Sequence, residues 1–416
     1  MQTVKLDEGL YRTDADNGIT VISEAMSGVR SVSVGVWVRA ASAHEVRPKM
    51  GVSHLLEHMV FKGTERRSAR DIAMELEVRG GSLDAFTARD HTAYQARVLD
   101  EDLPRALDVL TDLVRNPVLR STDLELERKV VLEEISTVED TPDELVFDLH
   151  AEALWPSHSY GFPILGTRET VANLQTDDLR TLHARAYHPR HVVIAAAGSL
   201  NHEVLLKLLA KCGWFSFEGG PTERPSVDVP RGQRTTQRVI RDLAQTHVVI
   251  GTDTFSYRDH RRYPLMLLTN VLGGGMSSRL FQRVREEMGL AYAVFSYHSF
   301  FEHSGVTGVY VATHPSTASD ARDAILSELG TLARAGLHGD ALAEAKQQLK
   351  GQVTLSLESS AARMYRAAGV VLYEQPYKTI DQILADIDGV RADEVAAVAS
   401  EFFEPERQTV AWLGPS

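Results

Sequence analysis

The stretch GVSHLLEHMVFKGT, residues 51–64, contains the pattern His-x-x-Glu-His at His54, Glu57 and His58. On an α-helix, His54 and His58 lie one turn apart, so both imidazoles project from one face toward a common point. Glu57 lies on the flank of that pair, roughly 60° around the helix from the nearer histidine. Two imidazoles can bind zinc, and the adjacent carboxylate can take a proton from a water on that zinc. The stretch therefore predicts a helix with two metal ligands and a general base.

The neighbours of this pattern separate it from a chance match. In a chain with 16 histidines, such a pattern arises by accident in roughly one sequence in twenty. The alternative is a solvated helix with two surface histidines. The apolar residues that argue against this alternative are Leu55, Leu56, Met59, Val60 and Phe61. They cover most of the helix circumference, and a polar His-Glu-His face among them needs a partner such as a cation.

A second predicted helix, about residues 122–138, supplies a candidate third ligand. Glu127 and Glu134 are seven residues apart, almost two full turns, so their carboxylates share a face, whereas Glu125 and Glu133 point away from it. Zinc hydrolases usually present three protein ligands and leave the fourth position to water. We therefore expect Glu134 to be the third ligand and Glu127 to orient a histidine or the base. Without the two histidines, solvated acidic residues would be the better interpretation.

Taken together, these motifs resemble the pitrilysin-type (inverted zincin) metallopeptidases, the group that contains the mitochondrial processing peptidase. Glu134 follows His58 by 76 residues. The stretch GGSLDAFTARDHTAYQARVLDEDL (Gly80–Leu103) is similar to the family's edge strand beside the metal. The stretch LGGGMSSRLFQRVREEMGLAY (Leu272–Tyr292) is similar to its glycine-rich loop with an Arg/Tyr pair. The resemblance covers roughly residues 18–413, with the motifs in the expected order.

The resemblance implies a zinc-dependent endopeptidase with one Zn²⁺ per chain and substrate-binding residues in both halves. Arg285 is expected to position the substrate or Tyr292, and Tyr292 to donate a hydrogen bond to the carbonyl oxygen under attack. An extended peptide is expected to add to the edge strand by backbone hydrogen bonds, which requires an unfolded segment. The residues expected to contact or guide this peptide are Leu83, Asp84, Ala85, Phe86, Thr87, Gly273, Gly274 and Gly275.

Other interpretations of these residues remain open. Without the resemblance, a surface arginine and a tyrosine in the core at the start of a strand would be the favoured interpretation of Arg285 and Tyr292, by roughly three to one. A glycine turn between helices would explain Gly273–Gly275, while a nucleotide-binding loop is disfavoured because no Gly-Lys-Ser/Thr follows. Members of the family typically have Asn where this chain has Asp84. An ionised Asp cannot donate a hydrogen bond, so substrate contacts there are expected to differ.

Composition excludes several classes of protein. The formal charge of −13, from 44 basic and 57 acidic residues, argues against nucleic-acid binding and is compatible with basic peptide substrates. The single cysteine, Cys212, excludes an internal disulfide framework and is typical of a reducing compartment. No apolar run approaches the length of a membrane span, and the first residues show no targeting pattern. A cytoplasmic location is therefore expected.

The two halves of the chain repeat one order of elements. In each half, β-rich runs alternate with helices, and a stretch rich in Pro and Gly at 217–235 separates them. The predicted fold is α+β, with two structurally similar domains at 1–216 and 236–416. Each domain is expected to be a mostly antiparallel sheet with helices packed on one side, and the first is expected to hold the metal.

The resemblance also bears on partners. Relatives of this length form half of an enclosed chamber, so a homodimer or a heterodimer with a paralogous subunit is expected. A non-catalytic peptide-binding protein or a structural assembly subunit of the same fold is the alternative, and such relatives would be expected to have a degraded site. All four residues of the predicted site are present here, which favours the peptidase.

Overall fold

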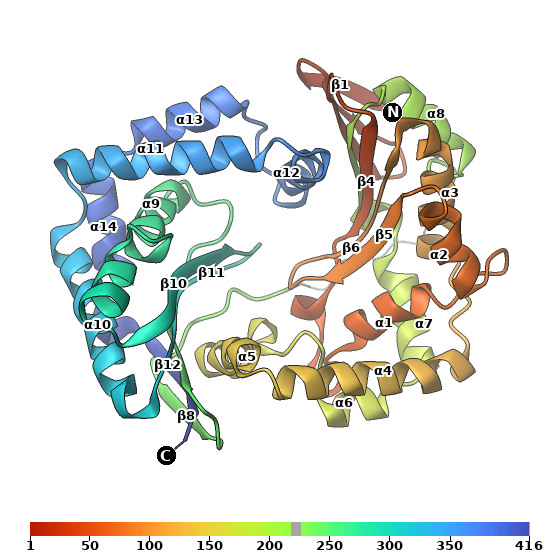
Figure 1. The fold of residues 1–416 in the computed structure, drawn as a ribbon. Helices are drawn as coiled ribbons and strands as arrows, with labels where there is room; N and C mark the ends of the chain where they lie inside the picture. Colours follow the sequence, from red (N-terminus) through yellow and green to blue (C-terminus); the bar gives the residue numbers. More distant parts are fainter. Residues whose placement is uncertain (218–225, 416) are drawn as a thin grey trace. The chain divides into compact units, whose positions relative to one another are not determined.

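The computed structural model describes residues 1–217 and 226–415, which form two compact units (Figure 1). Each unit contains one sheet with helices packed against it, which confirms the predicted α+β class with two domains. The segments of unit 1 are Met1–Ile135, Pro163–Val227 and Ser356–Tyr377, and those of unit 2 are Ser136–Phe162, Asp228–Leu355 and Lys378–Ser416. The chain thus passes between the units more than once.

The units differ from the continuous domains predicted at 1–216 and 236–416. One helix of the N-terminal half, α5 (Pro142–Leu154), belongs to unit 2, and one helix of the C-terminal half, α12 (Ser360–Leu372), belongs to unit 1. The passage at 227–228 lies inside the predicted linker 217–235, of which residues 218–225 lie outside the described residues. Periodicity shows that a helix is amphipathic but not which sheet it covers, so this exchange was not predictable from the pattern.

Unit 1 is built on a seven-stranded sheet in the order β1-β2-β3-β7-β4-β6-β5. The strands are β1 Gln2–Asp7, β2 Leu10–Asp14, β3 Thr20–Ala25, β4 Ser31–Val38, β5 Ser82–Thr87, β6 Thr92–Leu99 and β7 Val192–Gly198. Only β3 and β7 pair in parallel; the other neighbours are antiparallel. The strand β5 ends the sheet, which leaves one of its edges unpaired as an edge strand requires.

Helices cover both faces of this sheet, not one side as predicted from the sequence, and β4 is accordingly apolar on both sides. Val34 and Val36 belong to the larger core cluster, together with side chains of most helices of unit 1. Trp37 belongs to a second cluster, with Met364 and Val371 of α12. Successive residues of a strand face opposite sides, so the two clusters lie on opposite faces of the sheet. The other helices of unit 1 are α1 Val52–Val60, α2 Ala69–Glu77, α3 Leu103–Arg115, α6 Arg168–Asn173, α7 Thr176–Ala186 and α8 His202–Lys211. A long helix, α4 (Ser121–Glu139), starts in unit 1 and confirms the helix predicted at 122–138.

Unit 2 repeats this plan around a five-stranded sheet in the order β10-β11-β9-β12-β8. The strands are β8 Thr236–Ile240, β9 Thr246–Thr254, β10 Ala291–Phe300, β11 Gly305–Thr313 and β12 Thr409–Gly414. The helices are α9 Arg262–Gly273, α10 Ala318–Ala335, α11 Gly339–Ser356, α13 Ile380–Gly389 and α14 Ala392–Phe402. The exchanged helix α5 packs Val146 against Val249 and Leu413 of the sheet.

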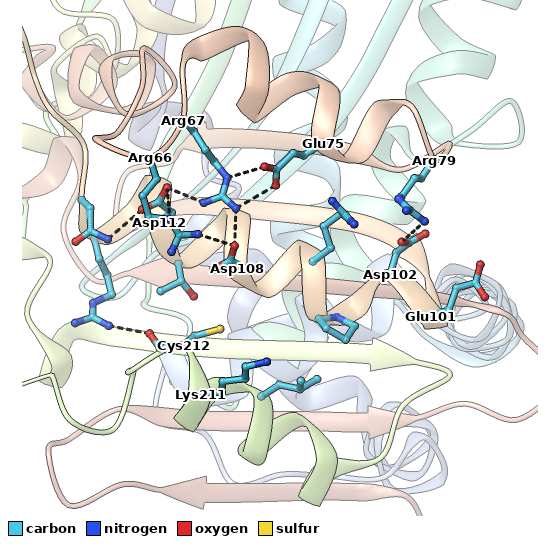
Figure 2. A pocket seen from close by; sticks show the side chains of 16 residues that line it. Arg66, Arg67, Glu75, Arg79, Glu101, Asp102, Asp108, Asp112, Lys211 and Cys212 are labelled. Carbon is cyan, nitrogen blue, oxygen red and sulfur yellow. Dashed lines mark hydrogen bonds and ion pairs between the residues drawn. The ribbon is translucent and has the colours of Figure 1, made fainter.

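A buried arginine fixes the loop that follows α1 (Figure 2). The guanidinium of Arg67, only 8% exposed, donates to both carboxylate oxygens of Glu75 at 3.1 Å and to Asp112 at 2.8 Å, and it also bonds Asp108. Asp112 additionally accepts from the hydroxyl of Thr64 at 2.7 Å. The loop is thereby tied to α2 and α3. A hollow of about 780 Å³ lies beside this network, and most of the charges that line it pair with one another.

Replacing Asp112 by Asn is expected to lower the free energy of unfolding at neutral pH by about 3 kcal/mol, because the buried guanidinium of Arg67 loses a charged partner. Burial alone would raise the pKa of Asp112, but hydrogen bonds from Thr64, Arg67 and Asn116 outweigh it and hold the pKa below its usual value. A carboxylate with a lowered pKa stabilises the fold above its unfolded-state pKa of about 4, and this contribution is lost as the pH falls through the folded-state pKa.

Urea denaturation at neutral and acidic pH tests this prediction. The stability difference between the wild type and the Asp112→Asn variant should shrink as the pH falls below about 4. The matched control is Asp108→Asn, whose side chain is 42% exposed and whose loss should cost less. Equal stability of the wild type and the Asp112→Asn variant at neutral pH would show that the pairing of Asp112 with Arg67 does not stabilise the fold.

Among the described residues, none of the helices is both long enough and apolar enough to cross a membrane.

Candidate metal centre

The two histidines project from α1, which is buried along most of its length. Both His54 and Glu57 are nearly covered, at 7% and 8% exposed, and Leu55, Leu56 and Met59 are fully buried in the main core cluster. The apolar side chains hold the helix against the core, as the sequence pattern predicted. The polar side chains are therefore held in one place by a rigid element rather than by a loop.

Three side chains bring ligand atoms together at this face of α1. The Nε2 atoms of His54 and His58 are 3.3 Å apart, and Oε2 of Glu134 on α4 lies 3.7 Å from the first and 3.6 Å from the second. The three form a group whose ligand atoms lie within 4.8 Å of one another. With metal–ligand bonds of about 2.1 Å and tetrahedral angles, donor atoms would be about 3.4 Å apart. The residues present thus match the donor set and the spacing of a zinc site.

The second ring nitrogen of His58 is hydrogen-bonded to a carboxylate. Its Nδ1 donates to Oε1 of Glu127 at 3.0 Å, and Lys62 donates to the second carboxylate oxygen of Glu127. This bond holds the His58 ring with Nε2 directed toward Glu134. The helical spacing predicted that Glu127 orients a histidine or the base, and here it bonds a histidine. The pattern did not indicate Lys62, because a lysine at the end of a helix is usually solvated.

Electrostatics at the site differ between the two histidines. Burial, together with the neighbouring His58, lowers the pKa of His54 to about 3, so His54 is neutral at physiological pH, as a ligand must be. Burial also lowers the pKa of His58, but the bond to Glu127 and the charges of Glu134 and Glu57 outweigh it, so the pKa of His58 is raised. Because the ligand atoms must be deprotonated, protons compete with a cation at this site.

Glu57, the predicted base, is held by the edge strand. Its Oε2 accepts a hydrogen bond of 2.5 Å from the hydroxyl of Thr87 on β5. Burial raises the pKa of Glu57, and the Thr87 bond and the charge of His58 partly offset this rise. Thr87 was predicted to contact a peptide, and the hydrogen bond to Glu57 is a function that sequence spacing did not indicate.

The remaining predicted residues of β5 alternate between the two faces of the sheet. Leu83 and Ala85 pack against the core cluster on the side of α1, while Asp84 is exposed. On the opposite face, the ring of Phe86 lies 6.0 Å from the ring of Tyr365 of α12. The Tyr365 hydroxyl donates to Gln95 at 2.5 Å, the residue that pairs with Asp84 in the sheet. Since Tyr365 lies 278 residues further along the chain than Thr87, it was not predictable from the motif.

The predicted residues of the second half all lie in unit 2. The guanidinium of Arg285 lies over the ring of Tyr292 at 5.0 Å, and Tyr292 is 80% exposed at the start of β10. The two side chains are therefore neighbours. Cβ atoms on Gly273 and Gly274 would lie 2.4 Å from the backbone nitrogen of Ser296 and 2.1 Å from Oδ1 of Asn270 respectively, whereas one on Gly275 would meet open space.

Two protein-family models match consecutive parts of the chain. Residues 20–168 match the family model described as insulinase (peptidase family M16), and residues 173–349 match the model described as peptidase M16 inactive domain. A protein of Bacillus subtilis named as an uncharacterized zinc protease is 39% identical over 409 residues, covering 98% of each chain. One of the same description from Streptomyces coelicolor is 38% identical over 414 residues, covering 97% of this chain and 89% of that one.

A solved structure shares the fold over nearly the whole length. The crystal structure of a protease from Helicobacter pylori superposes with a TM-score of 0.92 at 21% identity, covering 98% of this chain and 99% of the other. At that identity the likeness concerns the fold alone.

Proposed function

The chain belongs to peptidase family M16, and from this premise we propose that it is a zinc-dependent endopeptidase that cleaves unfolded peptides or flexible protein segments. The observation that carries the proposal is the group formed by His54, His58 and Glu134, with the carboxylate of Glu57 on the same helix as both histidines. The names of the relatives as zinc proteases support the choice of metal.

Each residue of the site has a proposed role. His54, His58 and Glu134 would hold the metal, which when bound supplies Lewis acidity that lowers the pKa of a water molecule and polarises a carbonyl group. Glu57 takes a proton from the attacking water and gives it to the leaving amine. The raised pKa of Glu57 suits a group that must accept and then release a proton near neutral pH.

We propose that the substrate lies along the free edge of β5 as an additional strand. Backbone hydrogen bonds would hold it, and its side chains would alternate between the α1 face and the α12 face. On the α12 face, the exposed carboxylate of Asp84 lies close to the rings of Phe86 and Tyr365. A carboxylate and aromatic rings both attract cations, which favours peptides with a basic residue at this position.

Arg285 and Tyr292 are proposed to act on the same substrate. The exposed hydroxyl of Tyr292 would donate to the carbonyl oxygen as negative charge builds on it, and Arg285 would hold the ring through the contact described above. The loop at Gly273–Gly275 is proposed to guide the peptide. A second chain, identical or paralogous, is proposed to complete an enclosed chamber, and the location is proposed to be cytoplasmic.

Thr87→Val is expected to lower kcat about tenfold while KM changes less than about twofold, because Glu57 loses the donor that fixes one of its oxygens. The variant retains the size and the β-branched shape of the side chain, so the strand should be unaffected. Steady-state cleavage of a quenched peptide measures both constants. The control is Thr3→Val on β1, because the hydroxyl of Thr3 bonds Thr13 and lies outside the candidate site. A Thr87→Val enzyme with wild-type kcat would show that the bond has no part in catalysis.

A non-catalytic peptide-binding or structural subunit of the same fold is the second candidate. It is favoured by the match of residues 173–349 to a model described as inactive. That match lies outside the segment that carries His54, His58 and Glu134, and this is the only group of its kind among the described residues. The inactive description therefore concerns the part of the chain without the candidate metal site.

The test of the proposed function uses two substrates of one composition. The zinc-loaded protein should cleave a flexible, basic peptide and leave the same sequence intact when it is held inside a folded domain. Cleavage of both would contradict binding by strand addition, and cleavage of neither by the zinc-loaded protein would favour the non-catalytic candidate.

A further inference from the structure

The helix that carries both histidines begins against a buried carboxylate that the mechanism above does not use. Glu45 is 8% exposed, and its two oxygens accept hydrogen bonds from the backbone N–H groups of Gly51 and Ser53, each at 2.8 Å. The first N–H groups of a helix have no partner within the helix, and a negative charge is favourable at this end. The side chain of Glu45, which lies six residues before Gly51, therefore caps the N-terminus of α1.

The backbone leaves the start of α1 little freedom to move. Gly51 has a φ of +86°, and a Cβ atom there would lie 2.4 Å from the carbonyl oxygen of Leu165. Lys49 forms an ion pair of 2.7 Å with Asp178 of α7. The chain entering α1 is thus held between the 165–166 loop and α7, and Glu45 adds the bonds that orient the first turn itself.

The segment that contains Glu45 is also bonded to the end of the edge strand. The N–H of Ala43 donates to the carbonyl oxygen of Arg89 at 2.8 Å. The hydroxyl of Ser42 donates to the carbonyl oxygen of Ala88 at 3.4 Å. These residues directly follow β5, which ends at Thr87, the partner of Glu57. A single short segment therefore contacts both the helix with the ligands and the strand that holds the base.

The two histidines differ in how their rings are held. Nδ1 of His58 is bonded to Glu127, whereas Nδ1 of His54 is buried and has no hydrogen-bond partner among the described residues. No side chain therefore orients the His54 ring through its second nitrogen. His54 is the third residue of α1 and follows Ser53, whose N–H Glu45 holds. The position of the first turn of α1 therefore determines where the ring of His54 lies.

We propose that Glu45 is a positioning residue for the metal centre. By bonding the N–H groups of Gly51 and Ser53, it fixes the first turn of α1 so that Nε2 of His54 lies at the spacing from His58 and Glu134 that a tetrahedral site needs. Glu45 thus positions His54 through the backbone, whereas Glu127 positions His58 through a hydrogen bond to its ring. This inference rests on the proposed function and assigns a residue that neither the motif nor its spacing indicates.

Glu45→Gln tests the proposal, because the amide keeps the shape but places an N–H group against a backbone N–H. The variant is expected to bind Zn²⁺ about tenfold more weakly. It is also expected to alter the visible absorption spectrum of Co²⁺ bound at the site, and to lower kcat more than it raises KM. The matched control is Glu24→Gln. Glu24 is a buried carboxylate of unit 1, 6% exposed, that pairs with Arg363 of α12. This control should lose stability without changing the affinity for Zn²⁺ or the Co²⁺ spectrum.

The outcomes separate this proposal from the proposed function. Wild-type affinity for Zn²⁺ and a wild-type Co²⁺ spectrum in folded Glu45→Gln would overturn the positioning role, whatever the peptidase assay shows. A zinc-loaded wild type without peptidase activity would overturn the proposed function. The Zn²⁺ affinity and the Co²⁺ spectrum of the variants would then still decide whether Glu45 positions the metal centre. Should Glu45→Gln fail to fold, Glu45→Asp, which keeps the charge but shortens the reach, is expected to fold with weakened Zn²⁺ binding. Unchanged binding in that variant would overturn the proposal.

Discussion

Glu57→Gln is expected to lower kcat/KM for peptide cleavage by about 10³-fold while zinc binding stays close to that of the wild type. Glutamine has the size of glutamate and can still accept the hydrogen bond from Thr87, but it cannot take a proton from water. Glu57 is not among the three residues whose ligand atoms come together, so its loss should not remove a donor. Metal content and steady-state kinetics on the same preparation measure the two effects.

An isosteric change of an exposed glutamate outside the three-residue group provides the control. Glu133→Gln alters an exposed residue next to Glu134 and should leave both zinc content and kcat/KM unchanged. If the Glu57→Gln protein kept more than about a tenth of the wild-type activity, proton transfer by Glu57 would not be the main contribution of this residue.

His58→Ala is expected to abolish retention of zinc on dialysis against metal-free buffer, and with it peptide cleavage. The change removes one of three donors and also leaves the buried carboxylate of Glu127 without the histidine it bonds. A site with two donors binds zinc too weakly to retain it, because structural and catalytic zinc sites use at least three protein ligands. Metal analysis after dialysis measures the loss.

An exposed histidine serves as the control for that experiment. His260 has a side chain that is 90% exposed and lies in unit 2, so His260→Ala should retain zinc and activity. Zinc retained by the His58→Ala variant at the wild-type level would show that the ion binds at a different place.

The parts of the site that lie on regular elements were predictable. The helical period places His54 and His58 on one face, and the seven-residue spacing of Glu127 and Glu134 places both carboxylates on one side of α4. The structure brings all four together because amphipathic helices bury the face that the sequence pattern marks. The edge position of β5 was also predictable, since the stretch Gly80–Leu103 that contains it is similar to the family's edge strand.

Residues that act across long distances in the sequence were not predictable. Glu45 caps α1 from a loop without periodicity, Tyr365 reaches β5 from α12, and Lys62 follows the helix that it helps to fix. Each depends on which surfaces meet after folding, which spacing within one element does not determine. The exchange of α5 and α12 has the same origin: each sheet has a second apolar face, and a helix of the other half covers it.

Removal and return of zinc shows whether peptide cleavage depends on the metal. The wild type is stripped with a chelator, dialysed and titrated with Zn²⁺, while cleavage of a quenched basic peptide and bound zinc are measured together. A zinc-dependent mechanism requires that cleavage disappears with the metal and returns in proportion to bound zinc, reaching its full value at one ion per chain. Cleavage that survives complete removal of metal would contradict it, as would a protein that binds its zinc again and cleaves no peptide.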